Sequence, residues 1–310
     1  MSREDIAEWA VFNRSQAAAF QSDGHLYHYT DAGGLKGILD SEQLWGTHAA
    51  YLNDSQEFAY GVEAISNMIA DYAEWVKEPE AGWKDPEAGS TIIGGVRNQV
   101  LIRAKEVLED EFAPFVTCFS VYADELSQWR GYANGGYAIC FDKEVLRQNV
   151  EQVRASSGDL PLPDEVIKPQ LRAVEYIPKK QYESVTNLVD AHITGLAALL
   201  KHEDKSARFK EAEQRLISLI VPMAASMKHH SFVSEAEERL ICHTSETFYT
   251  PSRIGLIPRV RFSFPPTAVR KVIVGPSPLD DVKQRSLTRY LKHKYPHVEV
   301  VPSAVPYREL

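Results

Sequence analysis

The chain of 310 residues contains little cysteine and no long hydrophobic run. Its three cysteines, Cys118, Cys140 and Cys242, are an odd number without metal-site spacing, which predicts a reduced protein without a disulfide framework. No stretch approaches the roughly 18 consecutive apolar residues that a membrane helix needs. The N-terminal segment is acidic and amphipathic and has no apolar signal-peptide core. We therefore expect a cytoplasmic protein with no membrane partner.

The motifs of several enzyme classes are also absent. No CxxC or HExxH pattern predicts a bound metal ion. Neither Ser120 nor Cys118 lies in a GxSxG or comparable nucleophile motif, which argues against a hydrolase triad. There is no internal repeat and no low-complexity linker. The chemistry must therefore be sought in scattered polar residues.

Charge is unevenly distributed along the chain. The net charge of -9 argues against a generic nucleic-acid binder, because phosphate contacts need clustered cations. Residues 251–310 nevertheless hold 11 Lys and Arg against 4 Asp and Glu, a local charge of +7. This basic segment has two possible partners, a phosphate-bearing molecule or the acidic remainder of the same chain.

Helical and strand-like segments alternate without a regular βαβ repeat, which predicts an α+β fold. Helical periodicity is present in residues 4–21, 32–41, 55–76, 94–112, 184–202, 206–229 and 280–294. Strand-like patterns are present in residues 26–30, 44–48, 115–120, 136–142, 172–177, 239–244, 260–264, 271–274 and 298–301. Gly- and Pro-marked loops are predicted at 78–90, 156–165 and 249–258.

The order of these segments predicts one domain over residues 1–310 with a mixed or antiparallel sheet. Large helical insertions are expected at about 62–112 and 143–228. The core strands are expected at about 25–60, 115–142, 172–177 and 232–310.

The segment "LYHYT", residues 26–30, is the first candidate for a binding site. In a strand, Leu26, His28 and Thr30 share one face while Tyr27 and Tyr29 share the other. His28 and Thr30 would then form a ligand-facing pair, although a satisfied core or rim histidine has the same pattern. The following "DAGGLKGILDS" predicts a helix begun by Thr30 or Asp31, whose glycines suggest close backbone approach.

Two further segments carry polar and aromatic candidates. In "YLNDSQEF", Asn53 or Asp54 is expected to cap a helix. The alternative is that Asn53 and Asp54 line the same cleft as His28. In "FVTCFSVYADELSQWRGYANGGYAICFD", the pattern is strand, helix, Gly-rich turn and strand. Ser120, Trp129 and Tyr132 would line an aromatic and polar pocket there.

The segment "SEAEERL", residues 234–240, allows two interpretations. As a helix, it pairs Glu235 with Arg239 on a solvated face, for only ~0.2 to 0.5 kcal/mol. As a strand, it places Glu235, Glu237 and Arg239 on one face and Glu238 on the other. Two carboxylates on one strand face suit different tasks on one substrate.

These segments together resemble a known family. "LYHYT", "YLNDSQE", "FVTCFS" with "QWRGYANGGYAICFD", "KHHSFVSEAEERLI", "KVIVGPS" and "SAVPYR" resemble, in this order, the bacterial domain-of-unknown-function family DUF2971. The resemblance runs from about residue 25 to 308. The His-x-Thr strand and the Glu-x-Glu segment also resemble, more weakly, the edges of the ADP-ribosyltransferase fold.

The weaker resemblance implies an ADP-ribosyltransferase-like sheet core and roles for particular residues. NAD would be the substrate, held by His28 and Thr30, with Glu237 catalytic and Glu235 orienting the acceptor. Tyr132 or Trp129 would pin the nicotinamide. The other residues assigned to the NAD site are Tyr29, Asn53, Ser120 and Arg239. A clear Ser-Thr-Ser middle strand is missing, which argues against the arginine-modifying branch.

The leading hypothesis is thus an NAD-dependent ADP-ribosyltransferase, a toxin-like or phage-defence effector acting on RNA, DNA or protein. A neutralising antitoxin or chaperone is a further expected partner. The alternatives are a non-enzymatic nucleotide- or nucleic-acid-binding module and an NAD glycohydrolase. The sequence leaves open the acceptor, the oligomeric state, and which of Glu235, Glu237 and Glu238 faces His28 across one cleft.

Overall fold

The computed structural model describes residues 24–52, 57–109, 114–156, 169–199, 205–242 and 246–306. The predicted helix at 4–21 and the candidate Asn53 lie outside them. The helices are α2 Ala32–Ser41, α3 Glu57–Trp75, α4 Pro86–Glu109, α5 Leu126–Gln128, α6 Lys143–Ser156, α7 Pro178–Leu199, α8 Lys205–Ala224 and α9 Asp280–Lys294. Short turns of helix are η1 Ala49–Tyr51, η2 Pro79–Ala81, η4 His230–Glu235 and η5 Pro266–Ala268, with the π-helical η3 Trp129–Ala133.

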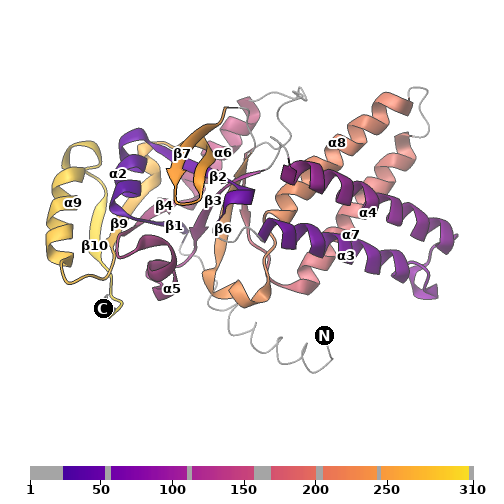
Figure 1. Ribbon diagram of the computed structural model, residues 1–310, viewed down its shortest axis with the longest axis horizontal. Helices are drawn as coiled ribbons and strands as arrows, with labels where there is room; N and C mark the ends of the chain where they lie inside the picture. The colour runs from indigo at the N-terminus through magenta and orange to yellow at the C-terminus, as the bar shows by residue number, and fades with distance from the viewer. Residues whose placement is uncertain are drawn as a thin grey trace.

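The strands form one mixed sheet that forks at a central strand (Figure 1). They are β1 His25–Thr30, β2 Gln43–His48, β3 Phe115–Ser120, β4 Tyr137–Asp142, β5 Gln170–Ala173, β6 Glu237–Cys242, β7 Phe248–Ser252, β8 Gly255–Ser263, β9 Val269–Val274 and β10 Glu299–Pro302. One edge of β3 pairs with β6 along its whole length. The other edge pairs with β2 at its start and with β1 at its end. The sheet continues from β1 through β4 and β9 to β10, and from β2 through β8 to β7.

The pairing directions confirm the predicted α+β class with a mixed sheet. β9 and β10 run parallel, whereas the other ladders between named strands are antiparallel in the described residues. The parallel pair needs a crossover, which α9 supplies between the two strands. The predicted helix at 280–294 is found with the same bounds.

Two hydrophobic cores lie on either side of β3 and β6. Helices α3, α4, α7 and α8 pack around apolar side chains that include Val116 and Ile241 (Figure 1). The other core fills the fork and includes Leu240, which neighbours Ile241 in β6 and therefore points to the opposite face. Helix α2 seals this second core with Leu35 and Leu39. Because side chains alternate along a strand, one face of β6 packs against the helical layer and the other face packs against the second core.

Helix α2 begins where the sequence predicted. Asp31 is its N-cap, and its carboxylate accepts a 2.7 Å hydrogen bond from the Gly34 amide. A Cβ on Gly34 would lie 1.9 Å from the Thr30 hydroxyl. The close approach expected at these glycines is therefore made, at Gly34, by the protein's own Thr30.

The predicted loop at 249–258 is wrong, since most of it belongs to a β-hairpin. β7 ends at Ser252 and β8 begins at Gly255, which has a φ of 116° that favours glycine. Pro251 and Pro258 suggested a loop, but an edge strand tolerates proline where no ladder hydrogen bond is needed. Similarly, α4 already begins at Pro86 inside the predicted loop 78–90, because proline is favoured in the first helical turn.

No helix in the described ranges is both long and apolar enough to cross a membrane.

Candidate active site

The segment "SEAEERL" is partly helical and partly a strand, whereas each of its two interpretations predicted one structure throughout. The short helix η4 ends at Glu235, and β6 begins at Glu237. Between them, the buried Ala236 adopts a left-handed conformation with φ 45° and ψ 55°. Such a conformation in a residue other than glycine stores on the order of 1 kcal/mol of strain and often marks a functional site. This turn sets the two carboxylates at the start of a central strand.

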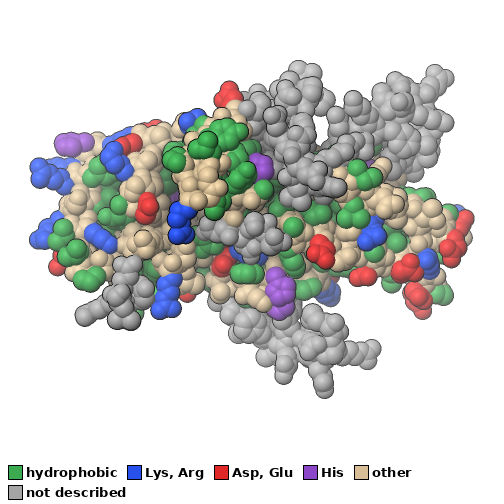
Figure 2. Space-filling view, in the orientation of Figure 1, with side chains coloured by type: hydrophobic (Ala, Val, Ile, Leu, Met, Phe, Trp, Pro, Cys, Tyr) green, Lys and Arg blue, Asp and Glu red, His purple; other side chains and the backbone are tan. Residues whose placement is uncertain are grey.

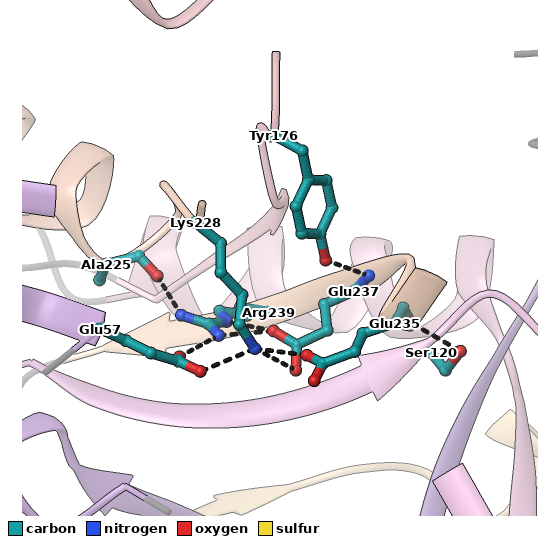
Figure 3. A network of polar contacts seen from close by, with 8 residues as sticks. All are labelled: Glu57, Ser120, Tyr176, Ala225, Lys228, Glu235, Glu237 and Arg239. Carbon is teal, nitrogen blue, oxygen red and sulfur yellow. Dashed lines mark hydrogen bonds and ion pairs between the residues drawn. The ribbon is translucent and has the colours of Figure 1, made fainter. Parts of the chain in front are cut away.

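Glu235 and Glu237 belong to a buried cluster of five charged side chains (Figure 3). The Arg239 guanidinium lies 2.5 Å from both the Glu237 and the Glu57 carboxylates. The Lys228 ammonium lies 2.7 Å from Glu57 and 3.6 Å from Glu237, and also pairs with Glu235. Each cation therefore bridges carboxylates from separate elements.

Further hydrogen bonds hold this cluster in place. Arg239 also donates to the Ala225 carbonyl at 2.9 Å, just beyond α8. The Tyr176 hydroxyl accepts a 3.0 Å bond from the backbone amide of Glu237. Ser120 donates to the Glu235 carbonyl at 3.0 Å. The backbone carrying both carboxylates is thus fixed from β3, from the segment after β5 and from the helical layer (Figure 3).

The cluster is almost closed to solvent, and one of its members differs from the rest. The Glu237 side chain is 4% exposed and Lys228 is 2% exposed, whereas Glu235 is 17% exposed. The formal charges of the five groups sum to -1 when all are ionised and to zero when one carboxylate is protonated. Glu235 is thus the member best placed to exchange a proton with water or a ligand.

The surroundings push the pKa values of the two glutamates apart. Burial raises the pKa of Glu235, and the negative charge of Glu237 adds to that rise against the opposing effect of Lys228. Burial alone would also raise the pKa of Glu237, but Arg239 and Lys228 outweigh it and lower the pKa. Two carboxyl groups whose pKa values are displaced in opposite directions are the usual pattern of an acid-base group beside a permanently ionised one.

Two exposed aromatic side chains are associated with this cluster, Phe232, whose ring centroid lies 4.9 Å from the Lys228 ammonium, and Tyr132. The Tyr132 ring is 38% exposed. Burial raises the pKa of the Tyr132 phenol, and the negative charges of Glu235 and Glu237 raise it further. Tyr132 lies in η3, a π-helical turn of a kind that occurs often at functional sites. Tyr132 is thus an exposed aromatic side chain whose phenol is influenced by the charges of the carboxylate pair.

Trp129 and Tyr29, by contrast, are buried. Trp129 is 1% exposed, donates to Asp124 at 2.6 Å and packs edge-on against Tyr29 at 4.8 Å between ring centroids. The Tyr29 hydroxyl donates to the Tyr122 carbonyl. Of the two aromatic candidates, only Tyr132 is thus exposed enough to stack on a ligand.

The structure does not bring His28 and Thr30 to the same face as Glu237. Tyr27 pairs with Ser120, and Ser120 pairs with Glu237, so these three side chains share a face. His28 alternates to the other face, where its ring contacts Phe119 edge-on at 5.8 Å. The open question of a shared cleft is answered by this register: His28 and Glu237 lie on opposite faces of the sheet.

His28 instead bonds to the backbone of the central strand. Its Nδ1 lies 2.9 Å from the Cys118 carbonyl, where β1 and β3 separate, and burial lowers the pKa of the ring. Cys118 is directly opposite Arg239 in the ladder. Burial, with the charge of Glu237, raises the pKa of the Cys118 thiol to about 12, so this cysteine is no thiolate at neutral pH.

Glu238 shares the face of His28 and has its own partner. Its carboxylate lies 2.7 Å from the Lys143 ammonium and is 6% exposed. Of the three glutamates in the segment, Glu235 and Glu237 belong to the cluster and Glu238 does not.

Sequence reasoning missed two members of the cluster. Glu57 is part of "YLNDSQEF", for which only capping and a cleft were considered, and Lys228 is part of "KHHSFVSEAEERLI", which was given only as a matching segment. Their signal was weak, because each is a single charged residue at the end of an amphipathic segment. Only the packing of the helical layer onto β6 brings them to Glu237. Within the described residues no group of three His, Cys, Asp or Glu side chains is arranged to hold a metal ion.

Comparison with known families identifies one match. Residues 128–240 match the family described as "Protein of unknown function (DUF2971)", which confirms the resemblance to that family for this part of the chain. The matched segment begins just before Trp129 and includes Tyr132, Lys228, Glu235 and Glu237. Neither the curated proteins nor the solved structures yield a significant match. The family therefore covers most of the cluster without supplying an activity.

Proposed function

We propose that the protein is an NAD-dependent ADP-ribosyltransferase whose reaction centre is the Glu235 and Glu237 pair. The observation that carries the proposal is the opposite displacement of their pKa values within one buried cluster. Cleavage and transfer at a glycosidic carbon need two carboxyl groups with different tasks, one ionised and one able to move a proton.

In this proposal Glu237 stabilises the reacting ribose. When the bond between C1′ and the nicotinamide nitrogen breaks, its electron pair leaves with the nicotinamide and C1′ becomes cationic. An ionised carboxylate fixed where water is excluded stabilises that charge. Arg239 and Lys228 keep Glu237 ionised and oriented. One interaction of this kind is commonly worth about 10²- to 10³-fold in rate.

Glu235 acts on the acceptor. The acceptor's oxygen or nitrogen attacks C1′, and its proton passes to the Glu235 carboxylate. A raised pKa makes Glu235 a stronger base than an ordinary glutamate once it is ionised. Its partial exposure gives the acceptor a route to it. The exposed ring of Tyr132 is the platform on which the planar nicotinamide stacks.

Other parts of the hypothesis depend on the resemblance alone. Binding of NAD by His28 and Thr30 stays a prediction, and the opposite-face register does not favour it. The same holds for an ADP-ribosyltransferase-like core, for a toxin-like or phage-defence role and for a neutralising antitoxin or chaperone.

The test is NAD turnover with Glu237→Gln and a matched control. Purified wild-type protein is incubated with NAD labelled in the adenylate half and with RNA, DNA or protein acceptors, and free nicotinamide is measured. We expect Glu237→Gln to lower nicotinamide release about 10²- to 10³-fold. Glu238→Gln, one residue away on the opposite face, should retain most of the activity.

Product analysis then distinguishes the two NAD-consuming reactions. Labelled ADP-ribose attached to an acceptor identifies transfer, whereas free ADP-ribose identifies NAD glycohydrolase activity. Thermal melting of both variants checks that they are folded. A wild type that releases no nicotinamide under any of these conditions, or a fully active Glu237→Gln variant, would refute the proposal.

A further inference from the structure

A second polar and aromatic surface lies on the other branch of the sheet. It is formed by Trp45 and Thr47 on β2, Arg259 and Arg261 on β8, and Phe248 on β7, and we call it the β7 face. The register pairs Trp45 with Arg261, Thr47 with Arg259 and Arg259 with Phe248, so all five side chains project from one face. Hydrophobic side chains gather over this hairpin in Figure 2.

The side chains of the β7 face form a rigid array. Trp45 is 42% exposed and meets Phe248 edge-on at 5.2 Å between ring centroids. The Arg261 guanidinium lies 3.7 Å from the centroid of Phe248. Arg259 donates to the hydroxyl of Thr47 at 2.6 Å and to that of Thr250 at 2.7 Å. Planar rings and planar cations therefore alternate across three strands.

No carboxylate among the described residues pairs with the arginines of this surface. Within the described part of the chain, neither Arg259 nor Arg261 forms an ion pair with a carboxylate. The sequence contains no Asp or Glu between Glu246 and Asp280. Exposed aromatic rings that stack on bases, interleaved with arginines that meet phosphates, are the recognition chemistry of single-stranded nucleic acid.

The β7 face and the carboxylate cluster belong to the same side of the sheet. Thr47 pairs with Val116, and Val116 pairs with Ile241, which shares its face with Arg239 and Glu237. Strand spacing and rise place the two surfaces on the order of 10 to 20 Å apart. One bound strand is long enough to touch both.

From this geometry we infer that the β7 face binds single-stranded nucleic acid, and that such a strand is the acceptor. The second part rests on the proposed function, whereas the first stands without it. The hairpin also exposes the large hydrophobic side chains Tyr249, Ile254 and Leu256. Of these, Leu256 projects from the opposite face and serves as a matched control.

The experiment measures the binding of fluorescent oligonucleotides of about 15 nucleotides by anisotropy, at several salt concentrations and without NAD. Single-stranded DNA, single-stranded RNA and a duplex of equal length are compared, with polyglutamate as an acidic polypeptide. We expect both single strands to bind more tightly than the duplex and polyglutamate. Trp45→Ala should weaken that binding roughly tenfold or more. Arg261→Glu should weaken it and reduce the slope of log affinity against log salt by about one or more.

Two control variants locate the surface. Arg285→Glu changes an exposed arginine on α9, at the opposite end of the sheet, and Leu256→Ser changes the other face of the same hairpin. Both should bind as the wild type does. Loss of binding in Arg285→Glu with retention in Arg261→Glu would move the site to the basic C-terminal segment and overturn the inference. Polyglutamate binding as tight as that of the oligonucleotides would overturn it in favour of an acidic protein partner.

The two proposals fail separately. Oligonucleotide binding is measured without NAD, so its result is independent of turnover. An active transferase that binds no oligonucleotide would refute the nucleic-acid inference and leave the catalytic proposal standing. Tight oligonucleotide binding without any NAD turnover would refute the catalytic proposal and leave the nucleic-acid binding standing.

Discussion

At the scale of single residues, Glu235 and Glu237 of the cluster respond to pH in opposite ways. The pKa of Glu237 is lowered, so its contribution to folding is present above the ordinary value of 4.5 and is lost as pH falls through its folded pKa. The pKa of Glu235 is raised, so the folded state holds its proton more tightly than the unfolded state. Stability therefore decreases as pH rises from 4.5 through the raised pKa.

This opposition predicts the behaviour of Glu235→Gln. Because the variant cannot ionise at this position, its stability should not fall with pH in the window just above 4.5, where the wild type loses stability. The difference between the wild-type and variant free energies of unfolding should therefore shrink or change sign as pH rises across that window. Urea denaturation at a series of pH values measures it. A difference that grows in favour of the wild type would contradict the raised pKa.

At the scale of elements, a glycine in α3 sets the distance to α8. A Cβ on Gly61 would lie 2.2 Å from the backbone carbonyl oxygen of Ala224, which cannot move without shifting its helix. Gly61→Ala should therefore cost about 1 to 3 kcal/mol, because overpacking outweighs the gain in helix propensity. Gly95→Ala in α4, where nothing lies within 4 Å, should instead stabilise by about 0.5 to 1 kcal/mol.

Thermal and chemical denaturation of both variants measure these changes. Equal effects at the two positions would show that α3 and α8 do not pack as closely as described. Because Ala225 accepts a hydrogen bond from Arg239, Gly61→Ala should also disturb the cluster and lower NAD turnover, whereas Gly95→Ala should not.

The elements also show which parts of the fold local sequence patterns can predict. Alternation and capping predicted β1, β3, β4, α2 and α9 closely, because each has a buried stripe or a cap within its own residues. β7 and the first residues of β8 were predicted as a loop, whereas the rest of β8 was predicted as a strand at 260–264. Most of β7 is exposed, so its pattern contains no buried stripe, and its existence depends on pairing with β8.

At the scale of the whole molecule, Glu57 links the helical layer to the sheet. It comes from α3 and pairs with Arg239 of β6 and with Lys228 after α8. Removing its carboxylate leaves two carboxylates for two cations, so no net charge is stranded, and the loss is that of buried charge-assisted hydrogen bonds, typically about 1.5 to 3 kcal/mol. We expect Glu57→Ala to lower the free energy of unfolding by about that amount and to reduce NAD turnover through the displaced Arg239.

The matched control is the exposed pair of Lys36 and Asp40. Lys36→Ala removes a surface ion pair and should change stability by less than about 1 kcal/mol. Urea denaturation followed by both circular dichroism and tryptophan fluorescence tests the comparison. Similar losses in the two variants would mean that the buried pair does not hold the helical layer on the sheet.

The sequence by itself predicted most of the strands and helices and, for the case that residues 237–240 form a strand, the opposite faces of Glu237 and Glu238. These properties follow from alternation and capping within a few residues. Only the tertiary structure decided that His28 lies on the opposite face, that Glu57 and Lys228 complete the cluster, and that Trp45 meets Arg261. Such contacts join residues far apart in the chain, and they depend on strand order and helix packing, which no local pattern specifies.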